Sequence, residues 1–332
     1  MSTDSISQPV EADAVAQALV TAATAGGYAP SIHNTQPWRW RVAAGALDLF
    51  IERSRSLDVT DPDLRLATLS CGAALHHART SLAVQGWHVS VARMPDRGDG
   101  DHLAQLRVDR RVPVDSVAVL HAWAVKLRHT DRRPLTGPPV GARQLEAIRA
   151  AVENEHTWLH MLTRDQVLDL ASAADHAQRA LADESPWRAE LAYWTGGRRP
   201  TGSGIPDSAI PAEATETTVA TRDFGHRGDL PVSAEHDKSA GYAMLYGNAD
   251  EPFDWLCAGE ALSAAWLTAT EQGVSVVPLS APIEVVGTRQ AMRTIIASVG
   301  YPYLMLRLGM VDPSDGWQPH TPRLPANQII DG

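Results

Sequence analysis

The chain has 332 residues, of which 44% are hydrophobic and 20% are charged, and its formal net charge at pH 7 is -10. This is an ordinary globular composition, with enough chain for one large domain or two smaller ones. An acidic surface repels phosphate backbones, so nucleic acid is not expected as a partner. The two cysteines, Cys71 and Cys257, cannot make a disulfide framework, which favours a reducing, cytoplasmic location.

Neither a signal peptide nor a membrane span is predicted. Residues 1–10 are polar and lack both a basic start and an apolar core. No stretch approaches the roughly 20 apolar residues that a membrane helix needs. We therefore expect no membrane partner.

Residues 12–127 read as alternating helices and strands. An Ala-rich helix ends at Gly26-Gly27, a hairpin turns near Gly45, and a long helix begins after Asp61-Pro62 and ends at Gly86. The predicted helices are 12–25, 63–85 and 114–127, and the predicted strands are 38–42, 46–51, 87–93 and 102–108.

The second part of the chain repeats this mixture of helices and strands, which indicates an α+β fold. Residues 196–237 differ, because they are rich in Gly, Pro, Ser, Thr and charge and lack an apolar period. A segment of that length without its own structure is either a lid over a site or a disordered loop, and both readings stay open. The predicted helices are 142–152, one or two within 165–194, 253–272 and 287–299, and the predicted strands are 157–162, 241–246, 274–278 and 303–310.

An internal repeat relates residues 71–86 to residues 258–273 without a gap. Gly72 falls on Gly259, and the Gln-Gly stop at the end of one helix falls on that of the other. Two Ala-rich helices can share small residues by chance, but the shared stop favours a duplication. Small residues let two helices approach closely. The sequence therefore predicts an intramolecular pseudo-dimer of two fused half-repeats, 1–125 and 126–332, the second carrying the insert at about 196–237.

The segment 29–38 carries the first functional motif, Ala-Pro-Ser-Ile-His-Asn-Thr-Gln-Pro-Trp. Its prolines stiffen the loop, and Ser31, Asn34 and Gln36 supply hydrogen-bonding groups suited to a phosphate or a flavin edge. Trp38 begins the strand that follows. The segment closely resembles the Pro-Ser-x-x-Asn-x-Gln-Pro-Trp signature of the nitroreductase-like flavoproteins. Its His-Asn-Thr form is similar to the mycobacterial Acg-type branch.

Two further segments resemble the parts of that family that hold the phosphate of FMN. Arg128, Thr130 and Arg132 match the family's Arg-x-Ser-x-Arg/Lys segment, and guanidinium groups bind phosphate in a bidentate fork. Arg323 matches the closing Lys-x-Arg-x-Pro segment, in which Thr321 stands at the first basic position. The resemblance implies that the three arginines bind the phosphate.

The segment 277–281 resembles the place where the family often has Pro-Ile-Glu-Gly beside the flavin ring. The resemblance implies that Pro278, Leu279 and Ser280 line the ring. Ser280 and Ala281 stand where the family has Glu and Gly, a departure that bears on reductase activity more than on flavin binding.

Taken together, the resemblance implies one FMN per chain at the interface between the repeats. The first half keeps the Ser31 and Asn34 loop but has no basic opening segment, and the second half keeps the arginines. The opposite site has therefore decayed, and a monomer is expected because the pseudo-dimer already buries the family's dimer interface.

Two functions remain open at this stage. In the first, an NAD(P)H-dependent reductase of nitroaromatics or quinones uses FMN, and no acid-base catalytic residue is identified. In the second, the chain stores or sequesters FMN under the 196–237 segment. No metal site is expected, since the adjacent His76 and His77 diverge on a helix.

Overall fold

The computed structural model describes residues 7–43, 45–196, 199, 202–213, 215, 217–232, 236–237, 239–311 and 320–331. The helices are α1 (Ser7–Gly26), α2 (Arg65–Val84), α3 (Ser116–Leu127), α4 (Ala142–Asn154), α5 (Arg164–Ala182), α6 (Ser185–Trp194), α7 (Pro252–Glu271), α8 (Ala281–Glu284), α9 (Val286–Ile295) and α10 (Ala326–Ile329). The strands are β1 (Trp38–Ala43), β2 (Ala46–Ile51), β3 (Trp87–Arg93), β4 (His102–Arg111), β5 (Trp158–Met161), β6 (Gly241–Gly247), β7 (Val274–Leu279), β8 (Tyr301–Met310) and β9 (Ile330–Asp331).

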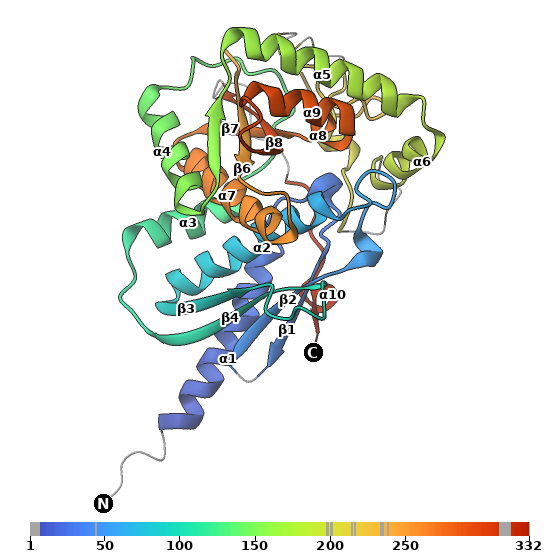
Figure 1. Cartoon of the computed structure of the whole chain (residues 1–332). Helices are drawn as coiled ribbons and strands as arrows, with labels where there is room; N and C mark the ends of the chain where they lie inside the picture. Colours follow the sequence, from blue (N-terminus) through green and yellow to red (C-terminus); the bar gives the residue numbers. More distant parts are fainter. Residues whose placement is uncertain are drawn as a thin grey trace, which may run out of the picture.

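The strands form two sheets with the same internal order. One sheet runs β3-β4-β2-β1-β9, and the other, taken from its β7 edge, runs β7-β8-β6-β5. If β1–β4 are matched in chain order with β5–β8, the two orders are identical except that β9 has no counterpart in the second sheet. Figure 1 shows one sheet below and one above, with α2 and α7 between them. The fold is therefore α+β and built from two fused half-repeats, as the sequence predicts.

The two halves meet where α2 and α7 touch backbone to backbone. A Cβ atom on Gly72 would lie 2.0 Å from the carbonyl oxygen of Leu256, and one on Gly259 would lie 1.9 Å from that of Leu69. Leu69 and Leu256 are equivalent in the repeat, as are the two glycines. A two-fold relation makes such reciprocal contacts, because each partner presents the same patch to the other. The predicted pseudo-dimer is confirmed in this contact.

Each half has its own hydrophobic core, and the two cores exchange one leucine. The first core packs α1 and α2 against the lower sheet and includes Trp38, Trp40 and, from α7, Leu256. The second packs α4 and α7 against the upper sheet and includes Trp266 and, from α2, Leu69. Because each core includes a leucine from the other half, each half is stabilised by its contact with the other.

The predicted elements agree with the structure, with differences at the short ones. The helix expected over 287–299 ends at Ile295, because Ala297 and Ser298 adopt left-handed backbone angles, with φ of 52° and 58°. The two-residue strand β9 was not predicted and pairs in parallel with β1. A strand that short has no readable alternation, and its partner lies almost 300 residues earlier in the chain.

The second half differs from the first mainly between β5 and β6. In the first half the equivalent strands β1 and β2 are joined by a tight turn at Gly45, whereas here α5, α6 and the segment 196–237 intervene. The described residues of the segment 196–237 are largely irregular, apart from a short 3-10 helix at Asp207–Ala209. They still pack into a small core with α6, made of Trp187, Leu191, Ile205, Ala209, Ile210 and Phe224.

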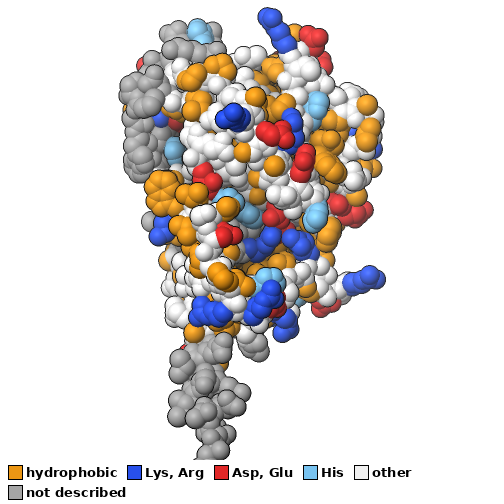
Figure 2. Space-filling view, turned by 90° about the vertical axis from the view of Figure 1, so that its left-hand side faces the viewer, with side chains coloured by type: hydrophobic (Ala, Val, Ile, Leu, Met, Phe, Trp, Pro, Cys, Tyr) orange, Lys and Arg blue, Asp and Glu red, His pale blue; other side chains and the backbone are white. Residues whose placement is uncertain are grey.

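The surface that carries α3 and α4 mixes hydrophobic side chains with charged ones (Figure 2). On α3, Val117, Leu120 and Trp123 are each at least half exposed. Scattered apolar residues are normal on a globular surface, so this face by itself identifies no partner. None of the described helices combines the length and the apolar character needed to cross a bilayer.

Substituting either glycine of the α2–α7 contact should destabilise the protein. We expect Gly72→Ala and Gly259→Ala each to lower the free energy of unfolding by about 3 kcal/mol, because the new methyl group meets a backbone carbonyl that cannot move aside alone. Urea denaturation measures this. Gly287→Ala is the matched control: it sits in α9 with no atom within 4 Å of the added Cβ, so it should be neutral or slightly stabilising. If Gly72→Ala and Gly259→Ala were both as stable as the wild type, the close contact between α2 and α7 would be refuted.

Candidate functional site

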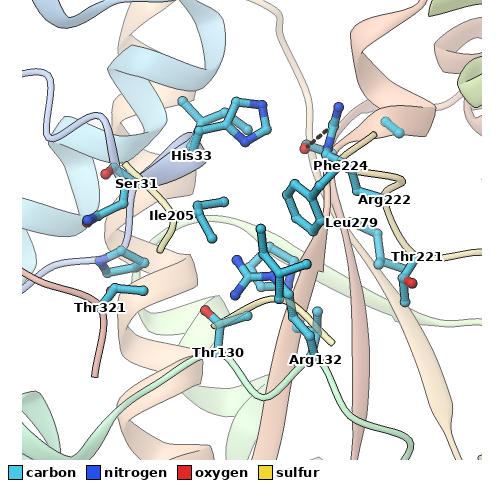
Figure 3. Close-up of a pocket in the computed structure, with 18 of the residues that line it drawn as sticks. Ser31, His33, Thr130, Arg132, Ile205, Thr221, Arg222, Phe224, Leu279 and Thr321 are labelled. Atoms are coloured by element: carbon cyan, nitrogen blue, oxygen red, sulfur yellow. Dashed lines mark hydrogen bonds between the residues drawn. The ribbon is translucent and has the colours of Figure 1, made fainter. Parts of the chain in front are cut away.

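A cavity of about 610 Å³ lies between the two halves. Its walls come from the loop before β1, the first turns of α2, the middle of α7, the end of β7, the segments 128–132 and 320–323, and parts of the 196–237 insert. Figure 3 shows side chains from these segments arranged around it. A volume of this size is typical of a small-molecule site.

Most of the predicted cofactor contacts line this cavity, although they lie far apart in the sequence. Gln36 and Trp38 do not. Trp38 is buried in the first core. The Gln36 amide nitrogen donates to the Gly202 carbonyl at 2.6 Å, and its amide oxygen accepts from the Leu324 N–H at 2.9 Å. Gln36 thus ties the motif loop to the insert and to the C-terminal segment. The predicted residues in the wall are Ser31, Asn34, Arg128, Thr130, Arg132, Pro278, Leu279, Ser280 and Arg323.

The motif loop has an unusual backbone. His33, Asn34 and Gln36 all have φ between 46° and 54°, in the left-handed region, which costs of order 1 kcal/mol or more for each residue that is not glycine. The hydrogen bonds of the Asn34 side chain offset part of this cost, and they connect the motif loop with the insert and with the C-terminal segment. The Asn34 side-chain nitrogen donates to the carbonyls of Gly204 and Pro322, both at 2.9 Å, and its oxygen accepts from Arg323 at 3.1 Å.

Arg128, which is buried, and Arg323, which is partly buried, form a pair of cations in the wall of the cavity. Both donate to the Tyr28 carbonyl, at 3.2 and 3.3 Å, and the Arg128 guanidinium lies 4.6 Å from the centre of the Trp266 ring. Within the described part of the chain, neither arginine has a carboxylate at ion-pair distance, and the Nε atom of each lacks a partner.

Burial lowers the pKa of both groups. Burial lowers the pKa of Arg323 to about 10, and burial together with the charge of Arg323 lowers that of Arg128. A buried cation without a counter-charge is costly, and two of them are more so. This part of the wall is therefore built for an anion.

Arg132 contacts the 196–237 insert and not the Tyr28 carbonyl. Its guanidinium donates to the Ala209 carbonyl at 3.1 Å and sits 5.6 Å from the centre of the Phe224 ring, so both contacts are with the insert. Burial lowers its pKa to about 10; the charge of Asp131 opposes this effect, and the charge of Arg222 adds to it. Arg222, also from the insert, forms an ion pair with buried Glu284 and donates to the Ser280 hydroxyl at 3.1 Å.

The position equivalent to the cavity on the other side of the pseudo-two-fold axis is filled by charged side chains. The repeat maps the cavity residues Trp266 and Ser280 onto Arg79 and Arg93. Both of these arginines donate to Glu260 at 2.6 Å, and the Glu260 side chain is fully buried. Arg79 also donates to Glu155 at 2.8 Å. A network of ion pairs thus stands where a second cavity would open.

Sequence reasoning did not identify several residues of the wall. His33 belongs to the motif loop, but sequence reasoning assigned no role to it: the residue is 6% exposed, lines the cavity and has a buried Nε2 atom for which the described residues provide no hydrogen-bond partner. Burial, Arg222 and Arg132 lower its pKa well below the usual value, so the ring is neutral. Arg222 and Phe224 lie in the irregular insert, where no pattern could relate them to a cavity.

Comparison with known proteins finds close relatives along almost the whole chain, although no family model matches it. The Mycobacterium tuberculosis protein named "Putative NAD(P)H nitroreductase Rv3131" is 35% identical over 322 residues, covering 95% of this chain and 92% of the relative. The one named "Putative NAD(P)H nitroreductase acg", from the same species, is 32% identical over 312 residues, covering 91% and 92%.

Solved structures give weaker matches. The FMN and NADPH-dependent nitroreductase NfnB from Sphigopyxis sp. has a TM-score of 0.40 and 15% identity, over 64% of this chain and 98% of that one. A nitroreductase with bound FMN from Bacteroides fragilis has a TM-score of 0.37 and 13% identity, over 63% and 96%.

The Glu260 network should contribute strongly to stability. Replacing Glu260 with Gln leaves Arg79 and Arg93 without their shared counter-charge, so we expect a loss of about 3 kcal/mol in the free energy of unfolding. Glu146→Gln is the control, since Glu146 pairs with Arg149 on the exposed face of α4 at 3.2 Å and such pairs contribute about 0.5 kcal/mol. Equal effects of the two substitutions would show that the network is dispensable.

Proposed function

Because the chain belongs to the family of the mycobacterial proteins Rv3131 and Acg, we propose that it binds one FMN in the cavity between its halves. With NAD(P)H as the reductant, it then reduces nitroaromatics or quinones. The names of these relatives support the reductase activity. The observation that carries the proposal is the pair of cations Arg128 and Arg323, which line a cavity of suitable size and have no carboxylate at ion-pair distance among the described residues.

The phosphate of FMN suits this pair because the charges match. A phosphate monoester carries a charge close to -2 at neutral pH, and two guanidinium groups neutralise it. Each charge-assisted hydrogen bond contributes about 1.5–3 kcal/mol. Thr130 lines the same cavity and can add a hydroxyl donor. Arg132, whose contacts are with the insert, is not needed for the phosphate in this assignment.

The rest of the cavity offers a largely apolar slot for a flat ring. Trp266, Pro278, Leu279, Ile205 and Phe224 all line it. When bound, the flavin supplies the capacity to accept a hydride and pass it on. The residues of the chain orient it, anchor its phosphate and limit access of water. No acid-base residue of the chain is assigned a catalytic step.

Storage of FMN is the second candidate function, and one observation favours it. Residues 220–227 of the insert line the cavity, and within them Arg222 is anchored by its ion pair with buried Glu284 and its hydrogen bond to Ser280. A cover fixed in this way retains a ligand and slows exchange. It also restricts the approach of a second substrate.

The organisation of the chain forms part of the same proposal. We assign residues 1–125 to the first half-repeat and residues 126–332 to the second. The proposed state is a cytoplasmic monomer, since the contact between α2 and α7 already provides internally the interface that two subunits would otherwise share.

Removing one phosphate-binding charge should weaken the preference for FMN over riboflavin. We expect the wild-type protein to bind FMN at least about 100-fold more tightly, and Arg128→Gln or Arg323→Gln to reduce that ratio about tenfold or more. Fluorescence titration of the flavin-free protein measures both ligands. Arg143→Gln, which removes an exposed charge on α4, should leave the ratio unchanged. An unchanged ratio in the Arg128 and Arg323 variants would exclude the assignment.

Anaerobic titration distinguishes a reductase from a storage protein. In the reductase, NADPH should bleach the visible flavin bands within seconds, because the nicotinamide reaches the ring. In a storage protein the bands should persist with NADPH and disappear only with dithionite. Persistence with NADPH and with NADH would count against the reductase proposal and leave flavin binding intact.

A further inference from the structure

A second cavity, of about 700 Å³, lies within the second half of the chain. Its walls are the end of α5, one side of α6 and part of the 196–237 insert, and all of the described residues that line it belong to 178–226. Residues 222–226 line both this outer cavity and the flavin cavity, which is the one assigned to FMN. These five residues are therefore a thin wall with open space on either side.

The wall between the two cavities has room to move. Protein interiors are close-packed, so a buried segment can shift only where space is already present, and the outer cavity provides that space. Gly225 adds freedom, because its φ is 74° and no atom lies within 4 Å of a Cβ built on it. Figure 3 shows Arg222 and Phe224 of this wall on the same side of the flavin cavity.

Building on the proposed function, we propose that residues 222–226 are a gate for the flavin. FMN enters and leaves when this wall withdraws into the outer cavity, and the side chain of Glu190 on α6 is the strap that limits the withdrawal. Movements of loops and short elements commonly gate the exchange of bound molecules.

The position of α6 decides how much room the wall has. Trp187 and Leu191 of this helix line the outer cavity, and both pack with Phe224 in the small core. The helix has ten residues, and a helix of that length depends on tertiary contacts, because its own hydrogen bonds do not stabilise it in isolation. Contacts that fix α6 therefore also restrict the wall.

One carboxylate fixes α6 to the other half of the chain. The Glu190 Oε1 atom accepts from the Val59 N–H at 3.0 Å, and its Oε2 atom accepts from the Thr60 N–H at 2.9 Å and from the Thr60 hydroxyl at 2.6 Å. The loop that donates these bonds is itself anchored, since the Asp61 carboxylate accepts from two backbone N–H groups in the first turn of α2, at 3.0 and 2.8 Å. Hydrogen bonds to a carboxylate are among the strong ones, so Glu190 is a strap between the halves.

The strap and the outer cavity predict opposite effects on flavin exchange. Without the strap, α6 can move away from the first half and the wall gains room, so FMN should exchange faster. A filled outer cavity leaves the wall less room, so FMN should exchange more slowly. Glu190 lines neither cavity, and the outer cavity has two alanines, Ala182 and Ala192, that do not line the flavin cavity. Substitutions at these three positions therefore leave the flavin contacts in place.

Exchange of bound FMN against an excess of isotopically labelled FMN measures the gate. We expect Glu190→Gln to speed exchange about tenfold or more, because the amide loses the charge. Ala182→Trp and Ala192→Trp place an indole in the outer cavity from α5 and α6 and should slow exchange several-fold. Glu184→Gln and Ala150→Trp are the matched controls. Both residues are exposed and line neither cavity, so both variants should exchange at the wild-type rate.

Two further results separate a gate from a general loss of stability. Adding Ala192→Trp to Glu190→Gln should restore slow exchange, because the indole occupies the room that the freed helix leaves. The ratio of the affinities for FMN and riboflavin should stay at the wild-type value in every variant, since the phosphate ligands are unchanged. If Glu190→Gln does not fold, Thr60→Val gives the test: it removes only the bond at 2.6 Å and should speed exchange by a smaller factor.

Several outcomes would overturn the gate while leaving flavin binding intact. These are a wild-type exchange rate in Glu190→Gln, a wild-type rate in both tryptophan variants, and a double variant that exchanges as fast as Glu190→Gln alone. A changed ratio of FMN to riboflavin affinity would also overturn it, because the flavin contacts themselves would then have altered. Failure of the proposed function looks different: a wild-type protein that takes up no FMN refutes flavin binding, and the gate with it.

Discussion

The contact between Gly72 and Gly259 fixes the geometry on which the rest of the molecule depends. Each glycine lies against the backbone one turn before its counterpart, so α2 and α7 approach more closely than side chains would permit. The spacing sets the distance between the two sheets. The same two helices contribute to the wall of the cavity, through Leu69 and Ser70 of α2 and through Leu262 and Trp266 of α7. A larger residue at either glycine would meet the backbone of the other helix.

Around this symmetric contact the two halves differ in chemistry. At equivalent positions one half has Trp266 and Ser280, which leave room for a ligand, and the other has Arg79 and Arg93. The latter two close around Glu260. Both arrangements bury charge between the halves. On one side protein carboxylates neutralise the arginines, whereas on the other Arg128 and Arg323 have no carboxylate at ion-pair distance in the described part of the chain. We interpret that difference as the reason for a single ligand site in each chain.

Much of this arrangement could be predicted from the sequence, because it depends on local patterns. Periodicity and stop residues predicted the long helices α2 and α7, and the aligned glycines predicted their contact. The motif residues Ser31 and Arg128 could be placed at a shared site through the family resemblance. Helix periodicity, stop residues and short motifs can each be recognised from residues that are close together in the sequence.

The remaining features depend on contacts between distant segments. Gln36 belongs to the motif, but its amide bonds to Gly202 and Leu324 instead of lining the cavity, and nothing near it in the sequence indicates those partners. Arg132 belongs to the motif segment 128–132, but its hydrogen bond to Ala209 and its contact with Phe224 are made with the insert. Arg222 reaches Glu284 from an irregular insert, where neither helical nor strand periodicity can guide a prediction.

The central claim is that both halves together build one flavin site in each chain. Stoichiometric titration of the flavin-free protein with FMN tests it most directly, at protein concentrations well above the dissociation constant. The account predicts a sharp break at one FMN per chain. A break at two would mean that the Arg79–Glu260–Arg93 network does not close the equivalent site, and the absence of saturable binding would contradict the assignment of the cavity to FMN.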